Sequence, residues 1–237
     1  MSRTELIKLI ENADSDWFAT ASIGNKLTKV KVMSTVLEKA VINEYGLSKF
    51  VLQIRPFLAM DDEQFFKFCQ ANRDVRIERN KEGEIIIMPP TGWDTGDKNS
   101  EINFQLRLWA KKDKHGKVGD SSTGFILPNG ATISPDNSWV RKDRIEQFSE
   151  KQRQKFLPLC PDFVIELRSA SDTLKDGRQK MEDYIENGAR LGWLIDPKNK
   201  RVYIYRPNSE VEILKNPETI SGEDILQGFE LDLTEIW

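Results

Sequence analysis

The segment 163–195 restricts the fold more than any other part of this sequence. Residues 163–165 are apolar at every position, a pattern typical of strands that are covered on both faces. Helical spacing of apolar residues follows over 175–187, and residues 192–196 have the pattern of a second strand. A strand, a helix and a strand in succession predict a parallel crossover. Because hairpins are predicted around this unit, the expected class is α/β, with a mixed β-sheet flanked by helices.

The other predicted elements follow from periodicity and turn residues. A hairpin is expected because two short β-like runs, 75–79 and 84–88, flank the turn 80–83. A second hairpin joins 192–196 to 202–205 around the turn 197–200. Helices are predicted near 60–72 and 98–112, and further strands near 124–127, 132–140, 211–214 and 229–231.

Composition excludes several classes of protein. Apolar residues make up 38% and charged residues 31% of the 237 residues, which is too apolar for wholesale disorder. No run approaches the ~18 apolar residues of a membrane helix, so we expect a cytoplasmic protein with no membrane partner. Cys69 and Cys160 are too few for a disulfide framework or a cysteine-rich zinc site. The single histidine, His115, lies in a predicted exposed turn, which disfavours histidine-based catalysis.

The N-terminal part differs from the rest of the chain. Residues 1–32 show a short helical pattern near 6–10 and no sustained period after it. Met33 is a plausible alternative start. We therefore expect residues 1–55 to be a partly disordered extension and residues 56–237 to form a single domain.

Acidic residues at two strand entries are the main candidates for chemistry. Pro135-Asp136 and Pro161-Asp162 each open a predicted central strand, a position that tolerates proline. Strand alternation places Asp162, Glu166 and Arg168 on one face. Burying Glu166 behind two apolar residues would be costly without a partner, so a metal ion or a salt bridge is expected there.

Several motifs occur together and in order, and each is weak alone. They are Gly83 to Gly92, Leu127 to Asp136, Pro161 to Ser169, Lys180 to Gly188, and Trp193 to Pro197. In this combination the chain resembles, over about residues 56–206, a large prokaryotic family of restriction-endonuclease-like proteins in the PD-(D/E)XK nuclease superfamily. The resemblance implies a restriction-endonuclease-like core for residues 56–237.

The resemblance also implies a Mg²⁺-dependent endonuclease, a hydrolase of DNA phosphodiester bonds, in which Mn²⁺ is an alternative ion. Asp136 matches the first acid and Glu166 the second, so both would be catalytic and metal ligands. Arg168 occupies the position where the family has lysine. Because arginine stays protonated, it cannot be the base, and a phosphate-binding role is expected. Lys180 on the following helix is the expected catalytic substitute, with Gln179 beside it.

Alternatives remain open at the level of residues. Asp162 is favoured as a hydrogen-bonding residue at the strand entry, and Tyr184, Trp139 and Trp193 as core residues. Glu84 and Glu101 are candidate extra acids that spacing does not decide between.

Partners and competing functions are also left open. The net charge of −3 means that DNA binding requires a local patch, and two basic stretches, 107–117 and 141–155, are candidates. Their other interpretation is a solvated charged face. A homodimer is open because a DNA duplex has two strands. The alternative functions are a catalytically impaired nucleic-acid-binding or interaction module, and a hydrolase of another substrate with Asp136 and Glu166 as acid and base.

Overall fold

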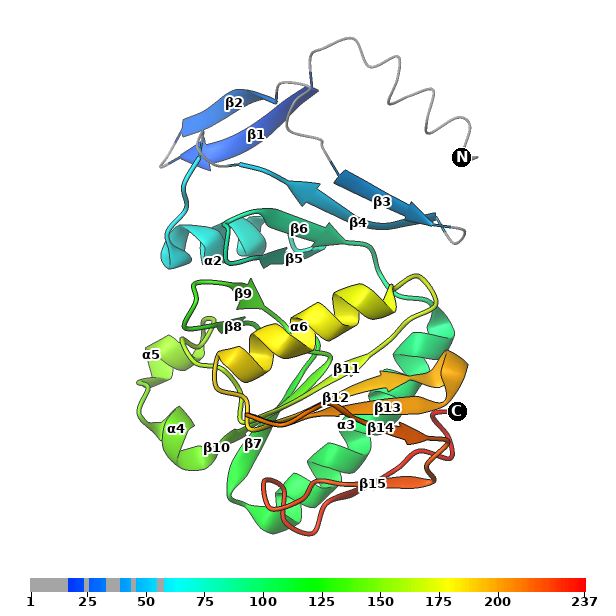
Figure 1. The fold of residues 1–237 in the computed structure, drawn as a ribbon. Coiled ribbons are helices and arrows are strands. Elements are labelled where there is room, and N and C mark those ends of the chain that lie inside the picture. Colours follow the sequence, from blue (N-terminus) through cyan, green and yellow to red (C-terminus); the bar gives the residue numbers. More distant parts are fainter. Residues whose placement is uncertain (1–16, 24–25, 33–38, 44–45, 55–57) are drawn as a thin grey trace.

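The fold is built around a mixed six-stranded sheet. We describe it from a computed structural model covering residues 17–23, 26–32, 39–43, 46–54 and 58–237. The strand order is β14-β13-β12-β11-β10-β7. These strands are β7 (Gly116–Asp120), β10 (Asn137–Arg141), β11 (Phe163–Leu167), β12 (Leu191–Asp196), β13 (Arg201–Tyr205) and β14 (Glu212–Lys215) (Figure 1).

The predicted crossover forms the centre of this sheet. Strands β11 and β12 pair in parallel and are joined by helix α6 (Leu174–Glu186). Thr173 caps the helix by accepting a hydrogen bond from the Asp176 N–H at 3.1 Å. Gly188, with φ +108°, ends it in a backbone conformation that suits glycine. The remaining neighbours in this sheet pair antiparallel, so the α/β class and mixed sheet are confirmed.

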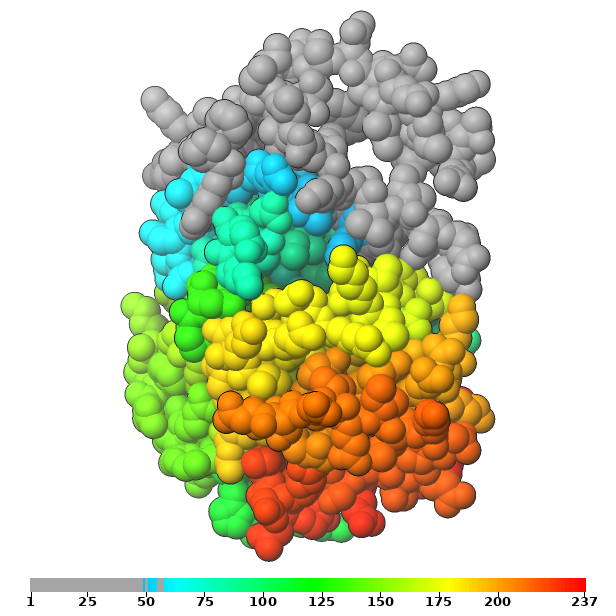
Figure 2. Space-filling view, viewed as in Figure 1, coloured from blue at the N-terminus to red at the C-terminus, as the bar shows by residue number. Residues whose placement is uncertain are grey.

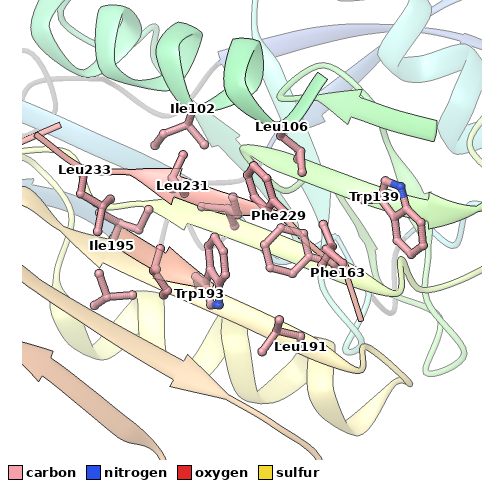
Figure 3. Packing of buried hydrophobic residues seen from close by; sticks show 14 of the residues in the cluster. Ile102, Leu106, Trp139, Phe163, Leu191, Trp193, Ile195, Phe229, Leu231 and Leu233 are labelled. Atoms are coloured by element: carbon pink, nitrogen blue, oxygen red, sulfur yellow. The ribbon is translucent and has the colours of Figure 1, made fainter. Parts of the chain in front are cut away.

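Both faces of the sheet are covered, as the apolar run in β11 predicts. Phe163 and Ile165 lie in a core cluster with residues of helix α3 (Trp93–Asp113), while Val164 lies in a second cluster with α6. Figure 3 shows Ile102 and Leu106 of α3 directed toward the aromatic rings on the first face. Phe163 and Trp193 pack edge to face with ring centroids 4.7 Å apart. The predicted core roles of Trp139, Trp193 and Tyr184 agree with their burial.

A second six-stranded sheet has the order β3-β4-β6-β5-β9-β8. Strands β5 and β6 form the predicted first hairpin, and β4 pairs with β6. Part of the predicted N-terminal extension therefore joins a sheet of the body, because β3 and β4 lie before residue 56. The domain boundary at 56 itself stays a prediction. The strands are β3 (Lys39–Asn43), β4 (Gly46–Leu52), β5 (Arg76–Arg79), β6 (Ile85–Met88), β8 (Phe125–Ile126) and β9 (Thr132–Ile133).

The remaining elements are short or lie at the periphery. The helical pattern near 6–10 and Met33 lie outside the described residues. No helix in the described ranges is long and apolar enough to cross a membrane. The elements outside the two six-stranded sheets, other than α3 and α6, are β1 (Trp17–Ile23), β2 (Lys26–Val32), α2 (Asp62–Ala71), α4 (Lys142–Glu146), α5 (Glu150–Arg153), η2 (Pro197–Asn199), β15 (Thr219–Ser221) and β16 (Glu230–Asp232).

Two predicted elements differ from the structure in ways that matter for the site. Helix α3 starts at Trp93, earlier than the apolar spacing indicates, because its first turn is exposed and polar. The single strand expected over 132–140 is two strands, β9 and β10, in different sheets. Pro135 lies at the break, where its missing N–H interrupts strand pairing. Asp136 therefore lies where the chain passes from one sheet to the other.

Glycine substitutions test the close packing between β7 and the Trp139 side chain of β10, with a loosely surrounded glycine of α3 for comparison. A Cβ at Gly116 would lie 2.2–2.5 Å from atoms of the Trp139 indole, so Gly116→Ala should destabilise the fold by about 1–3 kcal/mol. At Gly96, inside α3, the nearest atom would be 3.9 Å away. Gly96→Ala should therefore stabilise the fold by up to about 1 kcal/mol. Urea unfolding of the two variants checks this, and equal shifts of the same sign would contradict the packing described here.

Candidate active site

Strand register brings two acids together at the passage between the sheets. In the antiparallel pair β10–β11, Asn137 lies opposite Ile165. Continuing this register by one residue places Asp136 opposite Glu166. Directly opposite residues project from the same face of a sheet with Cβ atoms about 4.5–5.5 Å apart. Because Ile165 faces α3, Asp136 and Glu166 face α6.

Asp136 is held by contacts to both of its carboxylate oxygens. Its Oδ2 accepts a hydrogen bond from the Leu167 backbone N–H at 2.9 Å. Its Oδ1 lies 3.3 Å from Nη1 of Arg76 on β5. The first contact fixes Asp136 against the residue that follows Glu166, and the second links it to the other sheet.

Glu166 is paired with two residues of α6. Its Oε1 lies 2.9 Å from Lys180 Nζ and accepts a hydrogen bond from the Tyr184 hydroxyl at 3.0 Å. Lys180 and Tyr184 are four residues apart, which places them on the same side of the helix. Burial raises the pKa of Glu166 to about 7. The negative charges of Asp136 and Glu78 also raise this pKa, whereas the positive charge of Lys180 lowers it. Glu166 therefore titrates near neutral pH.

Glu78 on β5 completes the cluster from the second sheet. Its Oε1 accepts a hydrogen bond from the Ser134 N–H at 3.0 Å and lies 3.2 Å from Lys180 Nζ and 3.4 Å from Arg76 Nη2. Burial alone would raise the pKa of Glu78, but Lys180 and Arg76 outweigh it and hold that pKa below its usual value. Glu78 is thus a permanent anion in the cluster.

Lys180 lies between the two sheets and remains a cation. Burial alone would lower its pKa, but the carboxylates of Glu166 and Glu78 outweigh this effect, and the pKa is raised. Its ammonium group also contacts the Ser134 carbonyl at 3.3 Å. In Figure 2 the yellow atoms of α6 lie against the teal atoms of the segment that contains β5 and β6.

The structure therefore brings Asp136, Glu166 and Lys180 together, and it places Arg168 elsewhere. Arg168 Nη1 lies 2.9 Å from Asp196 Oδ2. Its Nε donates to the Asp172 carbonyl at 3.1 Å. Asp196 is fully buried and lies next to Arg168 across the parallel pair β11–β12. This ion pair argues against the phosphate-binding role predicted for Arg168, because releasing its guanidinium would leave a buried carboxylate without its cation.

The other candidate acids have local structural partners. Asp162 Oδ2 accepts from the Arg141 N–H at 2.9 Å, and its Oδ1 lies 3.0 Å from Arg144, which agrees with the strand-entry role. Glu84 accepts a hydrogen bond from the Asn80 side chain at 2.7 Å, within the β5–β6 turn. Glu101 accepts one from Gln105 at 2.9 Å, on α3. None of these contacts involves Asp136, Glu166 or Lys180.

Arg76 and Glu78 are site residues that the sequence interpretation missed. They alternate along a short strand whose hairpin partner, β6, is apolar. Glu78 is 4% exposed, and a charge buried to that degree needs a partner. Charged residues alternating within a predicted strand were the available signal, but their partners lie about 60–100 residues away in sequence.

The donor set is suited to a hard divalent cation. No group of three or more His, Cys, Asp or Glu side chains in the described part of the chain is arranged to hold a metal ion. Asp136 and Glu166 provide two carboxylates, and Mg²⁺ is commonly bound by one or two carboxylates together with water and substrate phosphates. With Glu166 ionised, three carboxylates face the two cations Arg76 and Lys180. Burial is the main reason that the pKa of Glu166 is raised, and the charges of Asp136 and Glu78 raise it further; a divalent cation beside this carboxylate would oppose both effects.

The two basic stretches do not surround this cluster. In the β7–β10 register, Asp120 lies opposite Asn137, next to the site, whereas Lys117 lies opposite Val140, about 10 Å further along the strands. Much of the second stretch is used in ion pairs: Arg141 with Asp143, Lys142 with Glu146, Arg144 with Asp162, and Lys155 with Glu63.

Comparisons with known proteins agree with this fold. The crystal structure of a putative nuclease belonging to DUF820 from Anabaena variabilis ATCC 29413 matches with a TM-score of 0.63 and 20% identity, over 75% of this chain and 97% of the other. No curated protein gives a significant match. The model of the Uma2 family, described as "Putative restriction endonuclease", matches residues 62–234, most of the chain. The protein therefore belongs to the Uma2 family of restriction-endonuclease-like proteins.

Proposed function

We propose that this protein is a metal-dependent endodeoxyribonuclease of the PD-(D/E)XK type, active with Mg²⁺ or Mn²⁺. The observation that carries the proposal is the meeting of Asp136, Glu166 and Lys180 from two neighbouring strands and the crossover helix. The description of the Uma2 family supports nuclease activity. The DNA substrate and the metal dependence are the proposed part.

Asp136 and Glu166 are the residues that would hold the ion. When bound, the ion would supply an activated water and stabilise the charge that builds up on the scissile phosphate. Glu166 is ready for this role at neutral pH, because a pKa of about 7 leaves a large part of it ionised and a nearby cation would ionise the rest. The Tyr184 hydroxyl, whose own pKa is raised by burial and by Glu166, stays protonated and fixes the orientation of this carboxylate.

Lys180 is assigned to electrostatic stabilisation. Because its pKa is raised, it is protonated at neutral pH and cannot accept a proton from water. Its ammonium group can stabilise negative charge on an attacking hydroxide or on a phosphate oxygen beside Glu166. This is the role that the resemblance gives to a lysine two residues after the second acid, where this chain has Arg168.

The guanidinium of Arg76 lies beside the acids Asp136 and Glu78. Its side chain is 32% exposed and contacts Asp136 and Glu78 as well as the Ser134 carbonyl. A partly exposed guanidinium beside the metal ligands can hydrogen-bond a phosphate of the bound strand. We therefore assign to Arg76 the phosphate contact that the sequence suggested for Arg168.

A second function is a nucleic-acid-binding or interaction module that keeps the nuclease fold without catalysis. The observation that favours it is that both acids already have cationic partners, Arg76 for Asp136 and Lys180 for Glu166. In this alternative the ion pairs replace the metal. DNA binding would then be independent of divalent cations and would weaken steeply with salt.

Plasmid cleavage separates the two functions. The purified protein is expected to convert supercoiled plasmid to nicked and linear forms in Mg²⁺ or Mn²⁺, and to leave it intact in EDTA, as followed on agarose gels. Isothermal calorimetry is expected to show binding of Mn²⁺ to the protein alone. Absence of both cleavage and metal binding, with DNA retained in a gel shift at low salt, would favour the binding module instead.

A further inference from the structure

Helix α3 has an exposed apolar stripe on the side away from the sheet. Ile102 and Leu106 point into the core (Figure 3), while Trp93, Phe104 and Leu108 are 85%, 60% and 46% exposed. Each residue advances a helix by about 100°, so these three exposed side chains lie within roughly 60° of one another. An exposed stripe of large apolar side chains marks an interaction surface.

The charges along the same stripe are arranged symmetrically about Phe104. Asp97 precedes Phe104 by seven residues, and Lys111 follows it by seven. Seven residues are nearly two turns, so both lie on the stripe, about 10 Å to either side of Phe104. Both are exposed, and neither forms an ion pair with any residue in the described ranges.

We propose that this stripe is the interface of a homodimer in which two α3 helices pack antiparallel about a two-fold axis at Phe104. An isologous contact requires a surface that is complementary to itself. In this arrangement Phe104 packs against Phe104 of the second copy, and Asp97 of each copy faces Lys111 of the other. This one arrangement therefore buries Phe104 of both copies and forms two Asp97–Lys111 ion pairs between them.

The polarity of the whole helix fits a second copy better than a nucleic acid. Asp94 lies in the first turn of α3, whereas Lys111 and Lys112 lie in the last turn. Phosphates would be repelled by the acidic half of the stripe, whereas an antiparallel copy meets opposite charge at both ends. Trp93 would lie beside the basic last turn of the second helix, where an indole attracts ammonium groups.

This surface is separate from the candidate active site. Helix α3 covers the face of the sheet that carries Phe163 and Ile165, whereas Glu166 faces α6. Dimerisation would leave Asp136, Glu166 and Lys180 uncovered by α3. The inference therefore does not depend on nuclease activity, and its test does not measure activity.

Sedimentation velocity of the full chain tests the apolar centre of the interface. Over about 1–200 µM, the wild type is expected to pass from monomer to dimer, with Kd on the order of 10 µM for a contact of one helix per copy. Phe104→Glu places like charges at the axis and should weaken association at least ~100-fold. Its unfolding midpoint should match that of the wild type, because the position is exposed.

A charge exchange tests the antiparallel register. Asp97→Lys and Lys111→Asp should each weaken self-association about tenfold or more, because each creates two like-charge pairs across the axis. An equimolar mixture of the two variants should form heterodimers, since every facing pair is then opposite in charge. Lys151→Asp, which makes the same charge change at an exposed lysine of α5, away from α3, is the matched control and should dimerise like the wild type.

Three results would overturn the inference. The first is that the wild type remains monomeric throughout the concentration range. If Phe104→Glu then weakens DNA binding, the stripe contacts nucleic acid and not a second copy. The second is a dimer that tolerates Phe104→Glu. The third is that Asp97→Lys and Lys111→Asp each self-associate as strongly as the wild type and form no heterodimer when they are mixed.

Discussion

Asp136→Asn is expected to lose metal-dependent DNA cleavage by at least ~10³-fold, or about 4 kcal/mol of transition-state stabilisation. Asparagine has nearly the same shape and can still accept the hydrogen bond that the Leu167 N–H makes with Asp136. It lacks the negative charge that a divalent cation requires from its ligand. The loss should therefore occur without unfolding, and the measurement is the initial rate of plasmid nicking at saturating Mg²⁺.

Glu84→Gln is the matched control for this variant. Glu84 is an acid of the neighbouring hairpin whose contacts are to Asn80, outside the cluster. It should keep wild-type nicking within about twofold, or ~0.4 kcal/mol. If Asp136→Asn and Glu84→Gln nick DNA at the same rate as the wild type, catalysis does not use the acids described here.

Glu166→Gln is expected to make the protein more stable at pH 8 in the absence of divalent cations. The pKa of Glu166 is about 7 in the folded state, against an ordinary value of 4.5. The folded state therefore holds this proton more tightly than the unfolded state does. The resulting stabilisation is fully present below pH 4.5 and is lost as the pH rises through 7. Between pH 5 and 8 this carboxyl should cost the wild type about 2–3 kcal/mol, a loss that glutamine avoids because it does not titrate.

Urea unfolding at pH 5 and pH 8 in EDTA measures this difference. The gap between Glu166→Gln and the wild type should widen with pH, while Glu84→Gln should follow the wild type at both values. Glu78, whose pKa is lowered, loses its contribution only at lower pH, so it does not act in this window. A constant difference between Glu166→Gln and the wild type at the two pH values would show that Glu166 is already ionised at pH 5.

The central fold could be predicted because its signals are local. An apolar strand, an amphipathic helix and a second apolar strand specify the β11–α6–β12 crossover, since both faces of the strands are buried. Asp136 was a candidate because it follows a proline at a strand entry, and Glu166 because it interrupts an apolar run; the resemblance to the restriction-endonuclease-like family then singled them out as the pair of acids. Their meeting follows from the antiparallel β10–β11 pairing.

The rest of the site depends on contacts between distant segments. Arg76 and Glu78 belong to a different sheet, and a sequence pattern does not give the packing of one sheet on another. Arg168 has the spacing of a site residue, yet it pairs with Asp196, which only the parallel register of β11 and β12 brings beside it. Residue spacing predicted which face these side chains share but not which partner each one takes.

Contacts between distant segments also decide where the N-terminal part of the chain joins the fold. Strand β4 pairs with β6 although it lies within residues 1–55, which the sequence led us to expect as an extension of the body. Lys49 on β4 lies 3.0 Å from Asp176 on α6, so this region contacts the helix that carries Lys180. Which strand edge a segment pairs with depends on distant parts of the chain, so the sequence of β4 did not reveal its place in this sheet.

The most direct measurement is the anomalous diffraction of a crystal of this protein soaked in Mn²⁺. A peak between the carboxylates of Asp136 and Glu166, with metal–oxygen distances of about 2.1–2.2 Å and the ammonium of Lys180 displaced from Glu166 Oε1, is the predicted result. Absence of a peak at saturating Mn²⁺, with the Arg76–Asp136 and Lys180–Glu166 ion pairs intact, would contradict a shared divalent cation at these two acids.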